Sequence, residues 1–251
     1  MNPPHPGRAP RLRVPLPSLK AGEPTLEPAV AHYVVRVRRL EVGDLFVGFD
    51  PARALEADVE ILGITPHEVS TRVGPLRPSD AVARREVTWV QALPKGEKMD
   101  SIVRDATELG ATRIIPATSA FTVVRLDGPR REARRQRWER IATEAARQCG
   151  RGDMPTIDAV VPWPLALAAA QGSGFCLHER ATAPLGPLLL AVVGTPSPIA
   201  FAAGPEGGLS SAEVLEATSR GFAIASLGPF VLRAETVAAA ALGALRVIEE
   251  I

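Results

Sequence analysis

From residue 86 onward, short apolar runs alternate with amphipathic stretches. This alternation is typical of a mostly parallel sheet covered by helices, so it predicts an α/β domain over residues 84–251. The apolar runs that suit strands are 86–93, 113–117, 156–161, 174–178, 199–203 and 223–227. The amphipathic stretches that suit helices are 97–109, 129–149, 163–170, 184–193, 210–220 and 235–250.

The first third of the chain follows another pattern. Between residues 31 and 83, short β-type runs are broken by glycine and proline, which predicts a small β-rich domain. Residues 1–30 are rich in proline and have little periodicity. We therefore expect an extended arm without regular structure there.

Composition narrows the class of protein. The chain has 251 residues, of which 46% are hydrophobic, and no apolar run long enough to span a bilayer. The proline-rich start does not resemble a signal peptide, so we expect a cytoplasmic protein with no membrane partner. Cys149 and Cys176 have no close Cys or His at metal-ligand spacing. We accordingly expect neither a disulfide framework nor a bound metal.

Charge is unevenly distributed although the net charge is only +1. Residues 1–40 hold seven Lys or Arg against two acids, residues 125–151 hold nine against four, and residues 152–251 hold four against nine. The basic stretches favour a surface for nucleic acid. For the helix 129–149, a solvated amphipathic face is the alternative. The candidate RNA-contacting side chains are Arg36, Arg39, Arg130, Arg131, Arg134, Arg135 and Arg151.

A glycine-rich loop follows the strand 199–203, with Gly204, Gly207 and Gly208 ahead of a helix whose start has the capping-box spacing Ser210 to Glu213. Glycines at the carboxyl edge of such a sheet let a ligand approach the backbone, and we expect a positive φ at Gly207. The loop lacks the Lys-Ser/Thr pair of a P-loop, and Glu206 would repel a triphosphate. A tight turn without a ligand is the alternative.

A second loop of the same kind follows the strand 223–227. Gly228 and Pro229 predict another tight turn, and Arg233 lies just before the last helix. Glu235 or Thr236 could cap that helix. Two such loops after successive strands would line one crevice.

These loops resemble the RsmE branch of the SPOUT methyltransferases, a family of ribosomal RNA uridine-N3 methyltransferases. The resemblance rests on Gly204-Pro-Glu-Gly-Gly208 followed by Leu227-Gly228 and Leu232-Arg233-x-Glu235-Thr236. Weaker matches extend it over nearly the whole chain. They are His32 to Leu40, Val42-Gly-Asp44, Lys95-Gly-Glu-Lys-Met99, Thr107-Glu-Leu-Gly110, Ile114-Ile-Pro116, Arg137-Trp138 and Gln148-Cys-Gly-Arg151 with Pro155.

The resemblance implies a fold, a cofactor and an assembly. It implies a PUA-like, RNA-binding β-barrel over residues 31–83 and a SPOUT-type α/β domain over 84–251 whose chain forms a trefoil knot. It also implies a homodimer that binds S-adenosylmethionine. The residues implied to contact this cofactor are Leu177, His178, Gly204, Pro205, Glu206, Gly207, Gly208, Leu227, Gly228, Leu232 and Thr236.

The implied reaction is methylation of N3 of a uridine in 16S (small-subunit) ribosomal RNA, free or in the assembled subunit. Such a reaction must remove the N3 proton and stabilise charge on the uracil oxygens. Arg233 and Glu235 are the catalytic candidates, and the base stays open among Glu206, Glu235 and the pair His178-Glu179.

Three other functions stay open. They are methylation of another base or a ribose 2′-oxygen, RNA binding by a non-catalytic ribosome-assembly factor, and metabolism of a small molecule by an α/β enzyme. The chain also departs from the family at Phe230, where an Arg is usual, and at Arg147, where an acid is usual.

Overall fold

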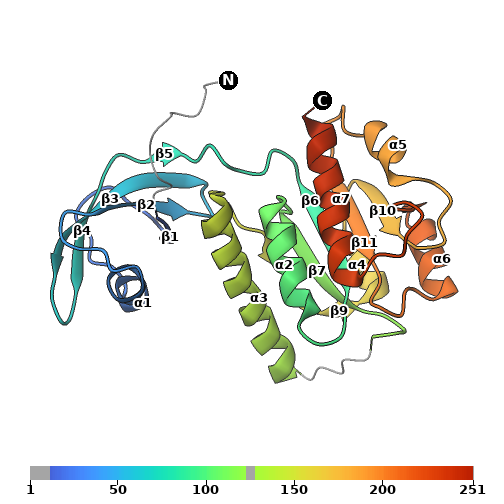
Figure 1. Ribbon diagram of the computed structural model, residues 1–251, viewed down its shortest axis with the longest axis horizontal. Coiled ribbons are helices and arrows are strands. Elements are labelled where there is room, and N and C mark those ends of the chain that lie inside the picture. The colour runs from blue at the N-terminus through green and yellow to red at the C-terminus, as the bar shows by residue number, and fades with distance from the viewer. Residues whose placement is uncertain (1–11, 123–127, 251) are drawn as a thin grey trace. The chain divides into compact units, whose positions relative to one another are not determined.

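The computed structural model describes residues 12–122 and 128–250, and the chain forms two compact units (Figure 1). The first unit comprises Met1–Val82 and Ala146–Asp153, and the second comprises Ala83–Ala145 and Met154–Ile251. The short segment Ala146–Asp153 belongs to the first unit because it packs there. The N–H of Gly152 donates to the carbonyl of Ala81 at 2.7 Å.

The first unit is built on a five-stranded sheet in the order β1-β2-β3-β4, with β5 paired to β3. β1 runs parallel to β2 and the other pairings are antiparallel. A buried core of Val34, Phe46, Val59 and Ile61 lies against the sheet. The elements are β1 (Arg13–Pro15), α1 (Pro28–Ala31), the π-helix η1 (His32–Val37), β2 (Leu45–Asp50), β3 (Leu55–Ile64), β4 (Val69–Val73) and β5 (Arg77–Pro78).

The expectation of no regular structure up to residue 30 is wrong for the described part of that segment. β1 adds a strand to the sheet, and Leu19 and Leu26 are buried in the same core. The N–H of Leu26 donates to the carbonyl of Val69 at 2.9 Å. The isolated leucines between prolines have no periodicity, so the pattern could not show that they are core residues. Residues 1–11 lie outside the described range.

The second unit holds a seven-stranded sheet in the order β12-β10-β11-β6-β7-β8, with β9 also paired to β7, and every pairing is parallel. Its strands are β6 (Val87–Ala92), β7 (Arg113–Thr118), β8 (Thr156–Ile157), β9 (Val161–Pro162), β10 (Ser173–Leu177), β11 (Ile199–Ala203) and β12 (Ala223–Ala225). Its helices are α2 (Lys98–Glu108), α3 (Gly128–Cys149), α4 (Trp163–Ala169), α5 (Leu185–Leu190), α6 (Ser211–Ser219) and α7 (Ala234–Glu249), except that the last four residues of α3 belong to the first unit.

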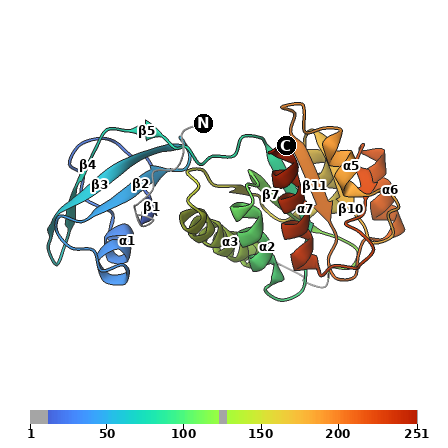
Figure 2. The same cartoon turned by 45° about the horizontal axis from the view of Figure 1, so that its top comes forward.

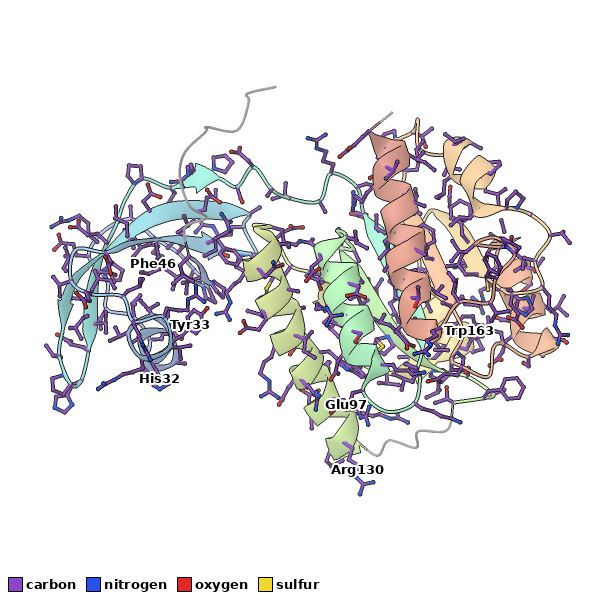
Figure 3. The ribbon with its side chains drawn as sticks, viewed as in Figure 1. His32, Tyr33, Phe46, Glu97, Arg130 and Trp163 are labelled. Carbon is purple, nitrogen blue, oxygen red and sulfur yellow. The ribbon has the colours of Figure 1, made fainter. Side chains whose placement is uncertain are left out.

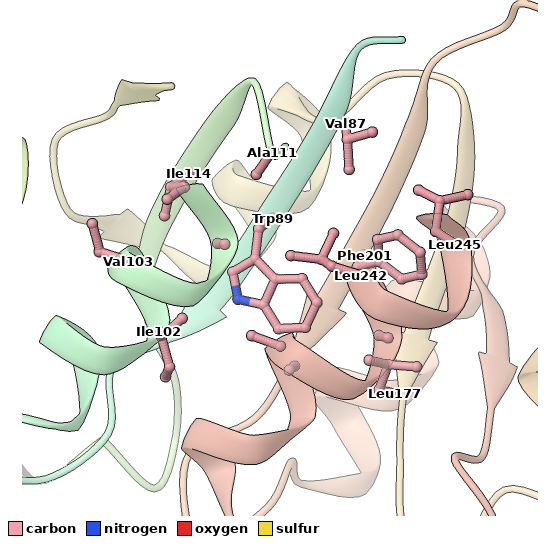
Figure 4. Packing of buried hydrophobic residues seen from close by; sticks show 14 of the residues in the cluster. Val87, Trp89, Ile102, Val103, Ala111, Ile114, Leu177, Phe201, Leu242 and Leu245 are labelled. Atoms are coloured by element: carbon pink, nitrogen blue, oxygen red, sulfur yellow. The ribbon is translucent and has the colours of Figure 1, made fainter. Parts of the chain in front are cut away.

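Helices cover both faces of this sheet because successive strand side chains point to opposite sides. On β6, Trp89 packs into one core with α2, α3, α5 and α7, whereas Val90 packs into a second core with α4 and α6. Trp89 is fully buried and its ring stands 5.9 Å from that of Phe201 (Figure 4). The domain therefore has three layers, with the sheet between two layers of helices.

Helices α2 and α7 lie side by side on one face of the sheet (Figure 2). Arg246 of α7 joins them, because its Nε donates to the carbonyl of Leu109 at 2.7 Å and its Nη2 to that of Gly110 at 2.9 Å. These carbonyls belong to the end of α2, where helical partners are lacking and a cation is favourable.

The predicted alternation of strands and helices is confirmed, with small differences in length. The predicted strand 156–161 is divided into β8 and β9. Asp158 lies between them, and its Oδ2 accepts from Arg113 Nη2 at 2.6 Å. The predicted helix 184–193 is shorter, and residues beyond Leu190 form turns. Gly110 and Gly150 end their helices with φ of 83° and 85°.

Candidate functional site

Three loops meet at the carboxyl edge of the parallel sheet. Leu177 at the end of β10 is in register with Ala203 at the end of β11 and with Ala225 at the end of β12. The residues that follow these strands therefore leave the sheet at the same edge. Open α/β sheets bind ligands in the crevice at this edge.

A cavity of about 470 Å³ opens at this edge. Its size falls within the range of small-molecule sites. All the candidate cofactor residues except Thr236 line it, together with Arg233 and Phe230. The lining residues are Lys98, Leu177, His178, Glu179, Ala203, Gly204, Pro205, Glu206, Gly207, Gly208, Leu209, Ser226, Leu227, Gly228, Phe230, Val231, Leu232, Arg233, Ala234 and Val237.

Glu206 is held as a carboxylate in the wall of this cavity. Its side chain accepts from the N–H of Lys95 at 3.1 and 3.2 Å and pairs with Lys98 Nζ at 2.9 Å. Partial burial by itself would raise the pKa of Glu206, but the hydrogen bonds from Lys98 and from two backbone N–H groups lower the pKa below its ordinary value. The cavity thus carries an ionised acid that is matched by one lysine.

Lys98 also lies 3.5 Å from Glu235 Oε2, so one ammonium links the glycine-rich loop to the start of α7. The hydrogen bond to Glu206 raises the pKa of Lys98, which keeps the ammonium charged at neutral pH. Glu235 faces this lysine and does not line the cavity.

A buried amide fixes the glycine-rich loop from below. Gln91 of β6 is fully buried, and its Nε2 donates to the carbonyl of Gly204 at 3.1 Å and to that of Ala92 at 3.0 Å. Trp89 Nε1 donates in turn to Gln91 Oε1 at 3.0 Å. Since each polar side-chain atom of Trp89 and Gln91 has a hydrogen-bond partner, the glycine-rich loop is anchored to the core of the domain.

The other end of the loop is fixed by the predicted capping box. Ser210 Oγ accepts from the N–H of Glu213, and Glu213 Oε2 accepts from the N–H of Ser210 at 2.8 Å. The carboxylate also accepts from the N–H of Ala120 at 2.7 Å through Oε1. The capping box is confirmed, and its glutamate also ties the loop after β7 to α6.

The pair His178 and Glu179 follows β10 on the cavity wall. His178 Nδ1 accepts from the N–H of Arg180 at 3.2 Å, so a neutral imidazole carries its proton on Nε2. Glu179 lies 3.8 Å from that Nε2 and is 40% exposed. The four candidate bases are Glu206, Glu235, His178 and Glu179. Among the described residues, only Glu179 has neither a side-chain hydrogen bond nor a Lys or Arg at ion-pair distance.

Arg233 is the N-cap residue of α7, and its carbonyl accepts from the N–H groups of Thr236 and Val237. Its side chain is exposed at the cavity wall and has no hydrogen bond or ion pair with any described residue. Neither Glu235 nor Thr236 caps the helix, so that structural alternative is wrong. Thr236 is exposed and lies outside the cavity lining.

The expected positive φ at Gly207 is wrong. The left-handed conformation occurs one residue later, at Gly208 with φ of 73°, and in the second loop at Gly228 with φ of 112°. Gly207 has a different constraint, since a Cβ there would stand 3.0 Å from Phe121 Cβ. The turn is made at Gly208 because the chain must reverse just before Ser210 opens the next helix.

The candidate RNA-contacting arginines differ in accessibility. Arg36, Arg39, Arg130 and Arg131 are exposed, and Figure 3 shows Arg130 at the N-terminal end of α3. Arg134 is partly buried, and Arg135 pairs with both Glu132 and Glu139.

Arg151 does not lie on an accessible surface, in contrast to what its place in a basic stretch suggests. Its side chain is 7% exposed and holds Asp153 at 2.7 and 2.9 Å. Arg147, the other departure from the family, stacks on Tyr33 with its guanidinium carbon 4.1 Å from the ring centre. Both therefore have structural roles within the first unit.

Sequence reasoning missed two residues of the site. Gln91 comes from β6 and Lys98 from α2, and both precede the glycine-rich loop that they contact by more than 100 positions. The motif Lys95-Gly-Glu-Lys-Met99 was the only signal for the lysine, and it carried no indication of its partner. The described residues include no cluster of acids, histidines and cysteines suited to a metal ion, and none of their helices is long and apolar enough to cross a bilayer.

Comparison with known proteins gives the class first. Residues 82–246 match the family model described as an RNA methyltransferase domain, so the chain is an RNA methyltransferase by family. It is 32% identical to ribosomal RNA small subunit methyltransferase E of Bacillus subtilis over 220 residues, covering 85% of this chain and 86% of that protein. The chain therefore belongs to the ribosomal RNA small subunit methyltransferase E family.

Two further proteins to which the chain is similar are also methyltransferases by name. The protein of the same name from Mycobacterium bovis is 36% identical over 171 residues, which cover 66% of this chain and 64% of that protein. A Legionella pneumophila protein described as a methyltransferase was solved with bound S-adenosylmethionine. It is 26% identical with a TM-score of 0.87, over 94% of this chain and 97% of that one.

Proposed function

We propose that the protein transfers a methyl group from S-adenosylmethionine to N3 of a uridine in small-subunit ribosomal RNA. The proposal rests on one feature of the site. A single cavity holds the two glycine loops and, on its wall, the guanidinium of Arg233 with no partner among the described side chains. The names of the relatives supply the substrate class, and the Legionella structure supplies the cofactor.

The residues of the cavity fit this cofactor. Gly204, Gly208 and Gly228 leave the backbone open to a ligand, and Leu177, Leu227 and Leu232 offer apolar surface to a purine and ribose. Glu206 and Glu179 provide negative charge, which suits a ligand with a sulfonium and an ammonium group. A triphosphate would be repelled by the same carboxylates.

The chain's own residues handle the uridine. The bound cofactor supplies an electrophilic methyl group, so the protein must position the base and manage the N3 proton. Arg233 is placed to donate to the uracil oxygens as negative charge develops. Glu179 accepts the N3 proton, since Glu206 and Glu235 are both engaged by Lys98 and His178 Nδ1 is occupied.

The proposal has an architectural part. We infer that the loops 204–208 and 227–233 belong to a trefoil knot and that the sheet of the first unit belongs to a PUA-like barrel that binds RNA. We also propose a cytoplasmic homodimer. Support for the dimer comes from α7, whose run of alanines permits close approach of a second helix, although Ala238 and Ala241 are already buried within one chain.

Mass spectrometry of the modified RNA tests the function. The protein is incubated with methyl-labelled S-adenosylmethionine and unmodified small-subunit RNA, either free or in the assembled subunit, and the RNA is digested to nucleosides. We expect label in N3-methyluridine. Label in a ribose 2′-O-methyl nucleoside or in another base would refute the N3 assignment. A protein that binds the RNA but neither binds the cofactor nor transfers its methyl would instead be an assembly factor.

The arginines at the start of α3 should contribute to RNA affinity. Replacing Arg130, Arg131, Arg134 and Arg135 together by glutamine should weaken RNA binding and flatten its dependence on salt, because each phosphate contact releases counterions. Arg135 should contribute least, since two glutamates already neutralise it. Filter binding between about 50 and 200 mM salt measures the slope. An unchanged slope would mean that this face of α3 is only solvated.

A further inference from the structure

The phenylalanines of this chain are divided sharply between core and surface. Five of the seven, Phe46, Phe49, Phe175, Phe201 and Phe222, are at most 6% exposed. The other two are Phe121, which is 49% exposed, and Phe230, which is 81% exposed. All seven lie in the described residues. Phe230 lines the cavity, whereas Phe121 lies outside the lining but next to Gly207, which lines it. Contiguous exposed apolar surface marks a binding site more often than a single exposed side chain does.

Phe230 lines the cavity from the second glycine loop. It follows the left-handed Gly228 and precedes Arg233. One short segment therefore carries an exposed aromatic ring and an exposed guanidinium that no described residue pairs with. The neighbouring Val231 is 79% exposed and lines the cavity too. This segment combines an apolar surface with a positive charge at the entrance of the site.

Phe121 lies against the glycine-rich loop, outside the cavity lining. Its Cβ and ring lie 3.0–3.8 Å from where a Gly207 side chain would begin. A tight turn holds it in place, because Thr122 N–H donates to the carbonyl of Ser119 at 3.1 Å and Ser119 N–H donates to Thr122 Oγ1 at 2.9 Å. The Glu213 carboxylate fixes the same turn through Ala120. The ring is thus exposed on a rigid support.

We propose that Phe230 and Phe121 are stacking platforms for two unpaired nucleobases of the RNA substrate. Phe230 takes the face of the base that enters the cavity, and Phe121 takes a flanking nucleotide beyond the glycine-rich loop. This inference rests on the proposed function, which requires a base held outside a duplex. Aromatic rings hold unstacked bases by their π-faces, and nearby cations hold the phosphates.

Charge favours RNA over a second copy of this chain as the occupant. Arg233 lines the cavity with Phe230 and has no partner among the described residues, and Lys98 adds a second positive charge that it shares with Glu206 and Glu235. A polyanion with flat bases matches an exposed ring beside the exposed guanidinium of Arg233, because the ring can stack on a base while the cation meets a phosphate.

Binding of single-stranded oligonucleotides tests the proposal. Phe230→Leu and Phe121→Leu keep apolar volume but remove the aromatic face. Each should weaken binding of a fluorescent ten-residue oligouridylate by about 5- to 150-fold, the range expected for one stacked base. Phe230→Tyr and Phe121→Tyr keep the ring and should bind as the parent does. Leu215→Ala changes another exposed apolar side chain, outside the cavity lining, and is the matched control.

Kinetics on small-subunit RNA separate the two platforms. Phe121→Leu should raise KM for RNA and leave kcat unchanged, whereas Phe230→Leu should also lower kcat because the reacting base is less well oriented. An abasic oligonucleotide should bind parent and leucine variants equally.

Two results would overturn the stacking role. One is unchanged oligouridylate affinity in both leucine variants. The other is a Phe230→Leu protein whose mass by light scattering is half that of the parent, which would place the ring between two chains. Failure of the parent to transfer methyl groups would refute the proposed function instead, because oligonucleotide affinity is measured without the cofactor.

Discussion

Replacing Arg233 by alanine is expected to lower the rate of methyl transfer by at least ~100-fold, the scale for losing one preorganised donor. The guanidinium is exposed on the cavity wall with no partner among the described residues, so it can meet the uracil oxygens without first breaking an ion pair. Cofactor affinity should change little, since the backbone of Arg233 is fixed by its place at the start of α7. Single-turnover assays at saturating RNA measure the rate.

Arg233→Lys should fail as well, because an ammonium lacks the planar fork that can reach two acceptors. Arg220→Ala is the matched control, as Arg220 is exposed in the same unit but lies outside this cavity and pairs with Glu216. Near-normal single-turnover rates for Arg233→Ala would remove the charge-stabilising role from this residue.

Replacing Gly208 by valine is expected to abolish binding of S-adenosylmethionine. Gly208 lines the cavity with φ of 73°, and a β-branched side chain is strained in this conformation. The strain costs of order 1–3 kcal/mol and would be relieved by moving the loop that the cofactor needs. A Cβ at this position would also come 3.6 Å from Glu179 Oε1, in the wall itself. Isothermal calorimetry measures the affinity.

Gly221→Val gives the matched control for strain. Gly221 has φ of 81°, its Cβ would meet no atom within 4 Å, and it lies after α6 outside the cavity. This variant should lose similar stability and bind the cofactor as the parent does. A folded Gly208→Val protein with parental affinity would exclude the glycine-rich loop from the cofactor site.

The α/β part of the fold was predictable because its signals are local. Strand residues such as Ile199–Ala203 are apolar on both faces, and helix ends are marked by Gly110, Gly150 and the Ser210–Glu213 box. The first unit was less predictable. Its β1 pairs with β2 across more than thirty residues, and nothing in a proline-rich segment indicates such a partner.

The site was predictable only where the glycines are. Two glycine loops after successive strands implied one crevice, and the parallel register brings them together there. The residues that hold the crevice in place could not be predicted from the sequence, because Gln91 and Lys98 contact residues more than 100 positions later. Arg151 shows the converse error, since a basic stretch does not reveal that one of its arginines is buried against Asp153.

The link between Arg246 and the end of α2 sets an order for folding. The two partners are 137 residues apart, and α7 supplies Leu242 and Leu245 to the core that surrounds Trp89. During synthesis, α2 and β6 therefore emerge long before the helix that covers them. Their apolar faces stay exposed to water, or bound by a chaperone, until α7 has been synthesised and packs on them. The same long loop closure makes a slow folding step in this domain the natural expectation.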